Sequence, residues 1–217
     1  MNFIFSPPPQ VSLAIAGSEL RFPVHRVYCV GRNYAEHVKE MGGVVGRDPP
    51  FFFAKPADAL VPDGRFPYPS ISTDVHHEIE LVVALGPDAK IFGHAVGLDM
   101  TRRDLQAAAK KLGRPWETAK GFDHSAPISK IIRKESALTA GAITLDVNGT
   151  RRQTGDIAEM IWSVDEIIDE LGKLFELKAG DLIFTGTPSG VAAVERGDRL
   201  HAEIAGVGVL DVEVVSG

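Results

Sequence analysis

The chain has 217 residues, of which 44% are hydrophobic, and this is enough to form the core of one domain. Its formal net charge of −6 and its lack of a basic run argue against a nucleic-acid partner, because binding to phosphates needs clustered lysine and arginine. No apolar run approaches the roughly 20 residues of a membrane span, and the first residues lack the basic start of a secretory signal. The single cysteine, Cys29, excludes an intrachain disulfide and a cysteine-based zinc site. We therefore expect a cytoplasmic protein without nucleic-acid or membrane partners.

The first fifty residues predict short strands and one short helix. Apolar runs separated by turn residues favour short strands over residues 3–24 and a buried strand over residues 26–31. Asn33 is a residue type that caps helices, so a helix is expected over residues 33–41. A helix of this length is only marginally stable by itself. The stretch 33–50 is therefore predicted to be a lid that becomes ordered mainly when a ligand is bound.

The rest of the chain is predicted to be rich in strands. Asn148 and Gly149 give a strong hairpin signal, and Ser163 with Glu166 forms a capping box at the start of a helix. Strands are expected at 51–55, 74–85, 93–100 and 181–187, hairpins at 143–152 and 199–215, further helices at 102–112 and 164–175, and irregular chain at 114–128. Strands outnumber the short helices and do not alternate with them. This pattern predicts a β-rich mixed α+β fold rather than a Rossmann or TIM arrangement.

Two glutamates in the expected 74–85 strand are candidate metal ligands. Side chains alternate along a strand, so His76, Glu78 and Glu80 share one face, with the two carboxylates about 7 Å apart. Asp99 ends the next strand, which we expect to pair with this one. Three carboxylates suit Mg²⁺ or Mn²⁺ and leave positions for water and substrate. The alternative is a half-buried strand with a hydrated polar face and an aspartate that serves only in a turn.

A histidine and a glutamate in the expected 33–41 helix form a second candidate site. His37 and Glu40 are three residues apart, so they lie on the same helix face. A carboxylate that holds one ring nitrogen of a histidine fixes its tautomer and raises its basicity, which suits a general base. A hydrated His–Glu pair without a function is the alternative.

Several basic residues are candidate counter-charges for an acidic substrate. Three carboxylates and a divalent cation leave a charge near −1, which repels an anion unless cations lie nearby. The candidates are Arg32, Lys55, Arg103 and Lys120, although each is also an ordinary surface residue type. A turn of hydroxyl groups and glycines at residues 185–190 adds a place where an anion can approach the backbone.

Taken together, these motifs resemble the fumarylacetoacetate hydrolase family, in its short branch of acylpyruvate and fumarylpyruvate hydrolases. They occur in family order across residues 26–190, and several spaced motifs in one order are far more specific than any one of them. The matching segments are Gly31-Arg32-Asn33-Tyr34 with His37, Phe52-Phe53-Ala54-Lys55-Pro56, His77-Glu78-Ile79-Glu80, Leu98-Asp99-Met100-Thr101 with Arg103, Asp104 and Gln106, Lys120-Gly121-Phe122-Asp123, Gln153, and Thr185-Gly186-Thr187-Pro188.

The resemblance implies a β-sandwich roll with a few short helices, usually assembled as a homodimer. We expect residues 1–217 to form a single catalytic domain of this type, with strands from residues 1–25 packed on it. The resemblance also implies that Glu78, Glu80 and Asp99 hold Mg²⁺ or Mn²⁺.

The resemblance further implies cleavage of a C–C bond in an acylpyruvate, which is a small acidic keto acid. His37 with Glu40 is expected to activate water, and Lys120 is expected to stabilise the pyruvate enolate that leaves. The residues expected to bind substrate are Arg32, Tyr34, Lys55, Arg103, Gln106 and Thr187. The segments 51–59 and 114–123 favour fumarylpyruvate, with Lys55 or Arg114 meeting its distal carboxylate.

Two other functions remain open from the sequence. The same site can stabilise the enolate that forms when oxaloacetate loses CO₂, so the chain can instead be an oxaloacetate decarboxylase. A non-catalytic binding member of the family is the second alternative. The intact pair of His37 and Glu40 argues against it, because a binding protein does not need a general base.

Overall fold

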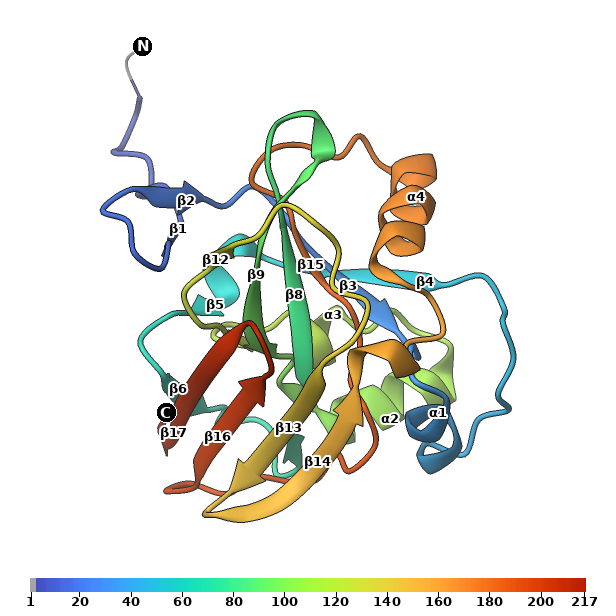
Figure 1. The fold of residues 1–217 in the computed structure, drawn as a ribbon. Coiled ribbons are helices and arrows are strands. Elements are labelled where there is room, and N and C mark those ends of the chain that lie inside the picture. The colour runs from blue at the N-terminus through green and yellow to red at the C-terminus, as the bar shows by residue number, and fades with distance from the viewer. Residues whose placement is uncertain (1–2) are drawn as a thin grey trace.

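The computed structural model describes residues 3–217, which form two larger sheets packed against each other (Figure 1). The first sheet has 6 strands, in the order β12 (Ile132–Arg133), β9 (Ile91–Leu98), β8 (Ile79–Leu85), β15 (Leu182–Phe184), β3 (Val27–Gly31) and β4 (Phe51–Lys55). The second has 5 strands, in the order β14 (Thr150–Asp156), β13 (Ala142–Val147), β16 (Arg199–Ile204), β17 (Gly208–Ser216) and β6 (Arg65–Tyr68). Shorter strands pair as β1 (Ser12–Ala14) with β2 (Arg21–Pro23), β10 (Thr101–Arg102) with β7 (Val75–His76), and β11 (Ala126–Pro127) with β5 (Leu60–Val61). The predicted β-rich mixed fold is confirmed.

Short helices cover the edges of this sandwich (Figure 1). They are α1 (Ala35–Glu40), α2 (Arg103–Leu112), α3 (Glu117–Lys120) and α4 (Val164–Leu174), with 3-10 turns at 57–59, 87–89 and 157–159. The helix α3 lies in a stretch that was expected to be irregular. The hairpin at Asn148-Gly149 and the capping box of Ser163 and Glu166 are present as predicted. Across residues 3–217, no helix is both long enough and apolar enough to cross a bilayer.

The main hydrophobic core lies between the two sheets. Ile79, Leu81, Val83 and Leu85 alternate along β8 and are buried in this core together with residues of β13 and β16. Burying one such side chain stabilises a fold by about 1.5–3 kcal/mol. Glu80 belongs to the opposite face of β8 because neighbouring side chains of a strand point in opposite directions. The alternation therefore directs the Glu80 carboxylate away from the core between the sheets.

The expected strand over residues 74–85 is broken at His77 and Glu78, so the prediction of one continuous strand is wrong. His77 N–H donates to Ala192 O (3.2 Å) instead of continuing a ladder. Gln153 Oε1 lies 2.8 Å from His77 Nδ1 and accepts from Ile79 N–H at 3.1 Å. These bonds to distant parts of the chain leave Glu78 on a short connection between β7 and β8.

Asn33 does not cap α1 as expected, because the N-cap residue is Tyr34. The Asn33 side chain instead donates to Trp162 O (2.9 Å) and Thr185 O (2.8 Å), and it accepts from Trp162 N–H at 2.7 Å. This side chain thereby ties the start of α1 to the end of β15 and to the segment before α4.

The strands β1 and β2 pack on the side of the first sheet that faces away from the main core. They pair antiparallel, and Leu13 and Phe22 are buried in a second core cluster with Val82 of β8. The treatment of residues 1–217 as one domain stays a prediction, and its first two residues lie outside the described chain.

Candidate active site

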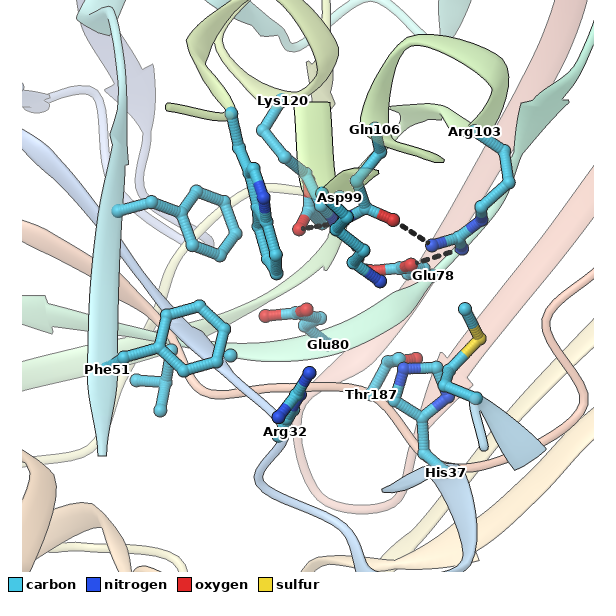
Figure 2. A pocket seen from close by; sticks show the side chains of 16 residues that line it. Arg32, His37, Phe51, Glu78, Glu80, Asp99, Arg103, Gln106, Lys120 and Thr187 are labelled. Carbon is cyan, nitrogen blue, oxygen red and sulfur yellow. Dashed lines mark hydrogen bonds and ion pairs between the residues drawn. The ribbon is translucent and has the colours of Figure 1, made fainter. Parts of the chain in front are cut away.

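One pocket gathers most of the side chains that the sequence singled out (Figure 2). Its volume is about 480 Å³, part of which is open to solvent. Its lining includes the predicted residues Arg32, His37, Glu78, Glu80, Asp99, Arg103, Gln106, Lys120 and Thr187. The segments that carry these side chains are far apart in the sequence and meet at one end of the first sheet.

Three buried carboxylates lie together at the base of this pocket. Glu78, Glu80 and Asp99 each offer a carboxylate oxygen within 4.8 Å of the others. Asp99 follows β9, and its N–H donates to Glu78 O (2.8 Å), which extends the pairing of β8 with β9 beyond the strand ends. Negative charges at this spacing repel each other strongly when they are removed from water. The cluster therefore requires positive charge close by.

Basic side chains supply part of that charge. Lys120 Nζ lies 2.7 Å from Glu78 Oε2 and 2.6 Å from Asp99 Oδ2. Lys55 Nζ lies 2.8 Å from Asp99 Oδ1, and Arg103 Nη2 lies 2.6 Å from Glu78 Oε1. Burial opposes the ionisation of Glu78, but the charges of Lys120 and Arg103 outweigh burial and hold its pKa well below its ordinary value. Burial likewise opposes the charge on Lys120, but Asp99 and Glu78 raise its pKa.

Glu80 is the member of the cluster whose charge is not compensated. Within residues 3–217 it forms no ion pair, and Gly186 N–H donates to its Oε2 at 2.8 Å. Burial and then the negative charges of Asp99 and Glu78 raise the pKa of Glu80 well above its ordinary value. A cation beside all three carboxylates would remove this cost. The donor set of three clustered carboxylates therefore fits a hard divalent cation.

Gly186 needs to be a glycine for this contact. Its φ is +98°, a region that other residues rarely adopt, and a Cβ there would lie 2.7 Å from the Cβ of Asn33. The absence of a side chain lets the backbone N–H approach Glu80.

The predicted pair of His37 and Glu40 is formed on α1. His37 Nδ1 lies 3.1 Å from Glu40 Oε2, and Gly190 N–H donates to the other carboxylate oxygen at 2.9 Å. His37 is 8% exposed and lines the pocket, whereas Glu40 does not line it. In the described chain, Nε2 of His37 has no hydrogen-bond partner. One ring nitrogen is thus held by a carboxylate and the other is free for substrate or water.

Arg103 and Gln106 lie next to each other on the first turns of α2. Arg103 Nη1 donates to Gln106 Oε1 at 2.7 Å, so the guanidinium is fixed by both Gln106 and Glu78 (Figure 2). The turn after β15 supplies Thr187, whose hydroxyl accepts from Gln153 Nε2 at 2.8 Å. Sequence reasoning gave Gln153 no role, yet its amide connects the break before β8 to this turn.

Two predicted substrate-binding residues lie outside the pocket lining. Tyr34 is 2% exposed, and burial raises the pKa of its hydroxyl. Lys55 has a fully buried ammonium that contacts Asp99 and Lys120 O, so it balances the cluster and is not placed to meet a substrate carboxylate. Arg114 does not line the pocket either.

His76 does not share the pocket with the carboxylates. It lies on β7, where it pairs with Thr101, and its Nε2 is 2.9 Å from Asp74 Oδ1. The break in the expected strand explains this placement, because it interrupts the alternation on which the grouping of His76 with the glutamates depended.

Lining residues that the sequence reasoning missed include Phe51, Trp116 and Lys110. The place of Lys110 in the pocket could have been predicted from its spacing in the sequence. Arg103, Gln106 and Lys110 stand at positions i, i+3 and i+7 of α2, so they share one helix face. Trp116 lies between α2 and α3, and no local pattern indicates that it turns towards the pocket.

Comparisons with known proteins identify the family of the chain. Residues 26–215 match the family described as Fumarylacetoacetate (FAA) hydrolase C-terminal. The structure is similar to that of fumarylpyruvate hydrolase from Pseudomonas aeruginosa in complex with Mn²⁺ and pyruvate, with 50% identity, a TM-score of 0.96 and coverage of 100% of both chains.

Two similar sequences carry a different name. Oxaloacetate tautomerase YcgM of Escherichia coli is 43% identical over 207 residues, which cover 88% of this chain and 93% of that protein. The mitochondrial oxaloacetate tautomerase FAHD1 of Rattus norvegicus is 44% identical over 194 residues, which cover 83% of this chain and 87% of that protein. The resemblance inferred from the motifs is thus confirmed, and the chain belongs to the fumarylacetoacetate hydrolase family.

Proposed function

We propose that this chain is a divalent-metal-dependent hydrolase that cleaves the C–C bond of an acylpyruvate, with fumarylpyruvate as the first candidate. The observation that carries the proposal is the meeting of the His37–Glu40 pair and the three-carboxylate cluster in one pocket. The similarity over the whole chain to a fumarylpyruvate hydrolase supports the choice of substrate.

We propose Glu78, Glu80 and Asp99 as the ligands of Mg²⁺ or Mn²⁺. The uncompensated charge of Glu80 and the clustering of three oxygens are what fit such an ion. When it is bound, the divalent cation supplies a positive centre that polarises the oxygens of a keto acid. The similar hydrolase from Pseudomonas aeruginosa contains Mn²⁺ and pyruvate, which supports this assignment.

His37 acts as the general base in the proposed reaction. Its Nε2 takes a proton from water, and the hydroxide attacks carbonyl C4 of the acylpyruvate. Glu40 holds Nδ1 of the same ring at 3.1 Å, so it orients the imidazole and stabilises the imidazolium that forms. The Gly190 N–H in turn holds Glu40 in place.

The bond between C3 and C4 breaks in the next step. Its electron pair stays on C3 and gives the enolate of pyruvate, while the acyl half leaves with the added hydroxyl as a carboxylic acid. The imidazolium of His37 returns its proton to C3, which completes pyruvate. Lys120, buried at the base of the pocket, provides positive charge for the enolate oxygen.

Arg103, Gln106 and Thr187 are proposed to hold the pyruvyl carboxylate. Arg103 is oriented by Gln106 and Glu78, so its guanidinium position is fixed before substrate arrives. Thr187 offers a hydroxyl that Gln153 keeps in place.

Chemistry on oxaloacetate is the second candidate function. The tautomerase names of two similar proteins favour it, because keto–enol interconversion also needs a base that moves a proton at C3. Decarboxylation of oxaloacetate would form the same pyruvate enolate with loss of CO₂. A non-catalytic binding role is a further alternative, and it leaves the arrangement of His37 with Glu40 unexplained.

A panel of substrates distinguishes these functions. Purified protein loaded with Mg²⁺ or Mn²⁺ is assayed with fumarylpyruvate, acetylpyruvate and oxaloacetate, and kcat/KM is compared for pyruvate release, CO₂ release and enol–keto exchange. We expect fumarylpyruvate hydrolysis to be the fastest reaction and to stop when EDTA removes the metal. Full activity in EDTA, or turnover of oxaloacetate alone, would contradict the hydrolase proposal, and no turnover at all would favour the binding role.

We also propose a cytoplasmic homodimer in which each chain is one catalytic domain. The burial of Leu13 and Phe22 in the same cluster as Val82 supports the inclusion of the N-terminal strands in that domain. Light scattering after size-exclusion chromatography measures the assembly, and a mass of about one chain would contradict the dimer.

A further inference from the structure

Two basic side chains line the pocket without an acidic partner in the described chain. They are Arg32, which follows β3, and Lys110, near the end of α2. Lys120 and Arg103, which also line the pocket, are both paired with Glu78. Arg32 and Lys110 line the pocket and are also partly open to solvent, and across residues 3–217 no carboxylate lies within ion-pair distance of either. The pocket therefore carries two positive charges that form no ion pair with the carboxylate cluster.

Two aromatic rings connect these two cations, and the four side chains of Arg32, Phe51, Trp116 and Lys110 together form one wall of the pocket. The rings of Phe51 and Trp116 meet edge to face, with centroids 5.2 Å apart and planes at 89°. Lys110 Nζ lies 5.1 Å from the centroid of Trp116, and Arg32 Cζ lies 5.9 Å from the centroid of Phe51. Both distances are in the range of cation–π contacts, which hold a charged group beside an aromatic face.

The backbone at the end of β3 has two unusual features next to this wall. A Cβ on Gly31 would lie 2.0 Å from Cζ of Phe51, so the ring occupies space that only glycine leaves free. Arg32 has a φ of +60°, which is uncommon for a residue with a side chain. Such backbone conformations gather at functional sites. Figure 2 shows Arg32 and Phe51 across the pocket from Lys120 and Gln106.

The positive charges on this wall repel one another. Burial, followed by the neighbouring positive charges of Arg103 and Arg32, lowers the pKa of Lys110. A bound anion near Arg32 and Lys110 would relieve this repulsion. The first carboxylate of an acylpyruvate already has a candidate position at Arg103, so the unused charge matches a second acidic group at the other end of the substrate.

We propose that Arg32 and Lys110, with the rings of Phe51 and Trp116, form a subsite for the distal carboxylate of a substrate diacid. This inference rests on the proposed acylpyruvate chemistry and specifies the substrate class. The aromatic faces pack on a planar unsaturated chain between the two acidic ends. The subsite thereby selects diacids such as fumarylpyruvate over acetylpyruvate, which ends in a methyl group.

Kinetics with two substrates tests the subsite. The variants Lys110→Met and Arg32→Met remove the charges and keep most of the apolar stems. We expect kcat/KM for fumarylpyruvate to fall at least about 10-fold more than kcat/KM for acetylpyruvate in each variant, as expected for a lost charged hydrogen bond. Lys111→Met on the same helix is the matched control, and it should leave the ratio within 2-fold because Lys111 is exposed and does not line the pocket. An equal loss on both substrates would overturn the subsite.

A binding measurement separates this inference from the proposed reaction. Titration calorimetry on the Mn²⁺-loaded protein compares 2-oxoheptanedioate with 2-oxoheptanoate, which have equal length and differ by the distal carboxylate. We expect the wild-type chain to bind the diacid about 10-fold more tightly, and Lys110→Met and Arg32→Met to abolish that preference while still binding the monoacid, which also shows that they are folded. No diacid preference in the wild-type chain would overturn the subsite even if acylpyruvates are cleaved. A preference without any cleavage would uphold the subsite and contradict the proposed function.

Discussion

Lys120 Nζ lies 2.6 Å from Asp99 Oδ2, and the same ammonium reaches Glu78 Oε2 at 2.7 Å. A lysine between two proposed metal ligands shares its partners with the cation that they would bind. Replacing it therefore changes the charge balance of the cluster as well as the charge available to an enolate.

The first prediction concerns this shared charge. Lys120→Met leaves Glu78 and Asp99 buried with less compensation, so in EDTA the free energy of unfolding should fall by about 3–5 kcal/mol. Mn²⁺ restores the missing charge and should raise Tm more in the variant than in the wild-type chain. Calorimetry in EDTA and in Mn²⁺ measures both effects. Lys178→Met, at an exposed pair with Glu176, is the control, and an equal Mn²⁺-induced shift in all three proteins would contradict the prediction.

The second prediction concerns the proposed base. His37→Ala should lower kcat by about 10²-fold or more because it removes the proton acceptor. It should change Mn²⁺ affinity much less, since in the described chain the ring of His37 is hydrogen-bonded to Glu40 and not to the three carboxylates. Glu40→Gln keeps the imidazole of His37 but loses the negative charge that orients it, so we expect kcat to decrease less than in His37→Ala. Steady-state kinetics and metal titration check these changes. Turnover retained in His37→Ala would remove His37 from this role.

The third prediction concerns the segment between α1 and β4, which is part of the stretch 33–50 that we still expect to act as a lid. Arg47 forms an ion pair with Glu166, and its guanidinium lies 4.6 Å from the centroid of Trp162. Arg47→Ala removes both contacts. Hydrogen exchange of residues 41–50 should become about 2- to 5-fold faster, as suits exposed contacts of this kind.

Oxalate provides the comparison for the lid, since it resembles the acidic end of a keto acid. We expect it to slow exchange of residues 41–50 in the wild-type chain and to do so less in Arg47→Ala. Lys39→Ala, which removes an exposed pair with Glu36 on α1, serves as the control. If oxalate gives no protection to the wild-type segment, the lid hypothesis fails.

The fourth prediction concerns pH and a histidine away from the pocket. Burial lowers the pKa of His94, whose Nε2 donates to Ser136 O at 2.9 Å. The unfolded chain therefore binds a proton more readily than the fold does, and the free energy of unfolding falls as pH decreases below the ordinary histidine value of 6.5. At higher pH this contribution to stability is complete.

His94→Gln removes the titrating group and can still donate a hydrogen bond to Ser136 O. We measure the free energy of unfolding in urea at pH 7.5 and at pH 5.5. The difference between the two values should be smaller in the variant than in the wild-type chain. His124→Gln is the control, because His124 is exposed and forms no ion pair in the described chain. The prediction fails if the free energy of unfolding changes by the same amount between the two pH values in the wild-type chain and in His94→Gln.

Local signals in the sequence predicted those parts of the structure that depend on neighbouring residues. The hairpin at Asn148-Gly149 follows from two residues that favour positive φ, and the cap at Ser163 follows from a reciprocal bond with Glu166. The contact of His37 with Glu40 follows from their spacing on a helix. The geometry of each is decided within a few residues.

Contacts between distant segments account for what the sequence did not predict. The break at His77 arises from a bond to Gln153, which is 76 residues away. The burial of Lys55 depends on Asp99 and on the backbone of Lys120, so its sequence neighbourhood could not distinguish a substrate contact from an internal counter-charge. Trp116 reaches the pocket because of how α2 and α3 pack together, and this requires the fold to be known.

The amide of Gln153 connects β14 of the second sheet to Ile79 of the first sheet, to His77 just before it, and to Thr187. Its oxygen and nitrogen therefore fasten the two sheets together beside the proposed active site. The two sheets cannot slide apart on warming while the catalytic groups keep their positions, so thermal inactivation should coincide with melting instead of preceding it.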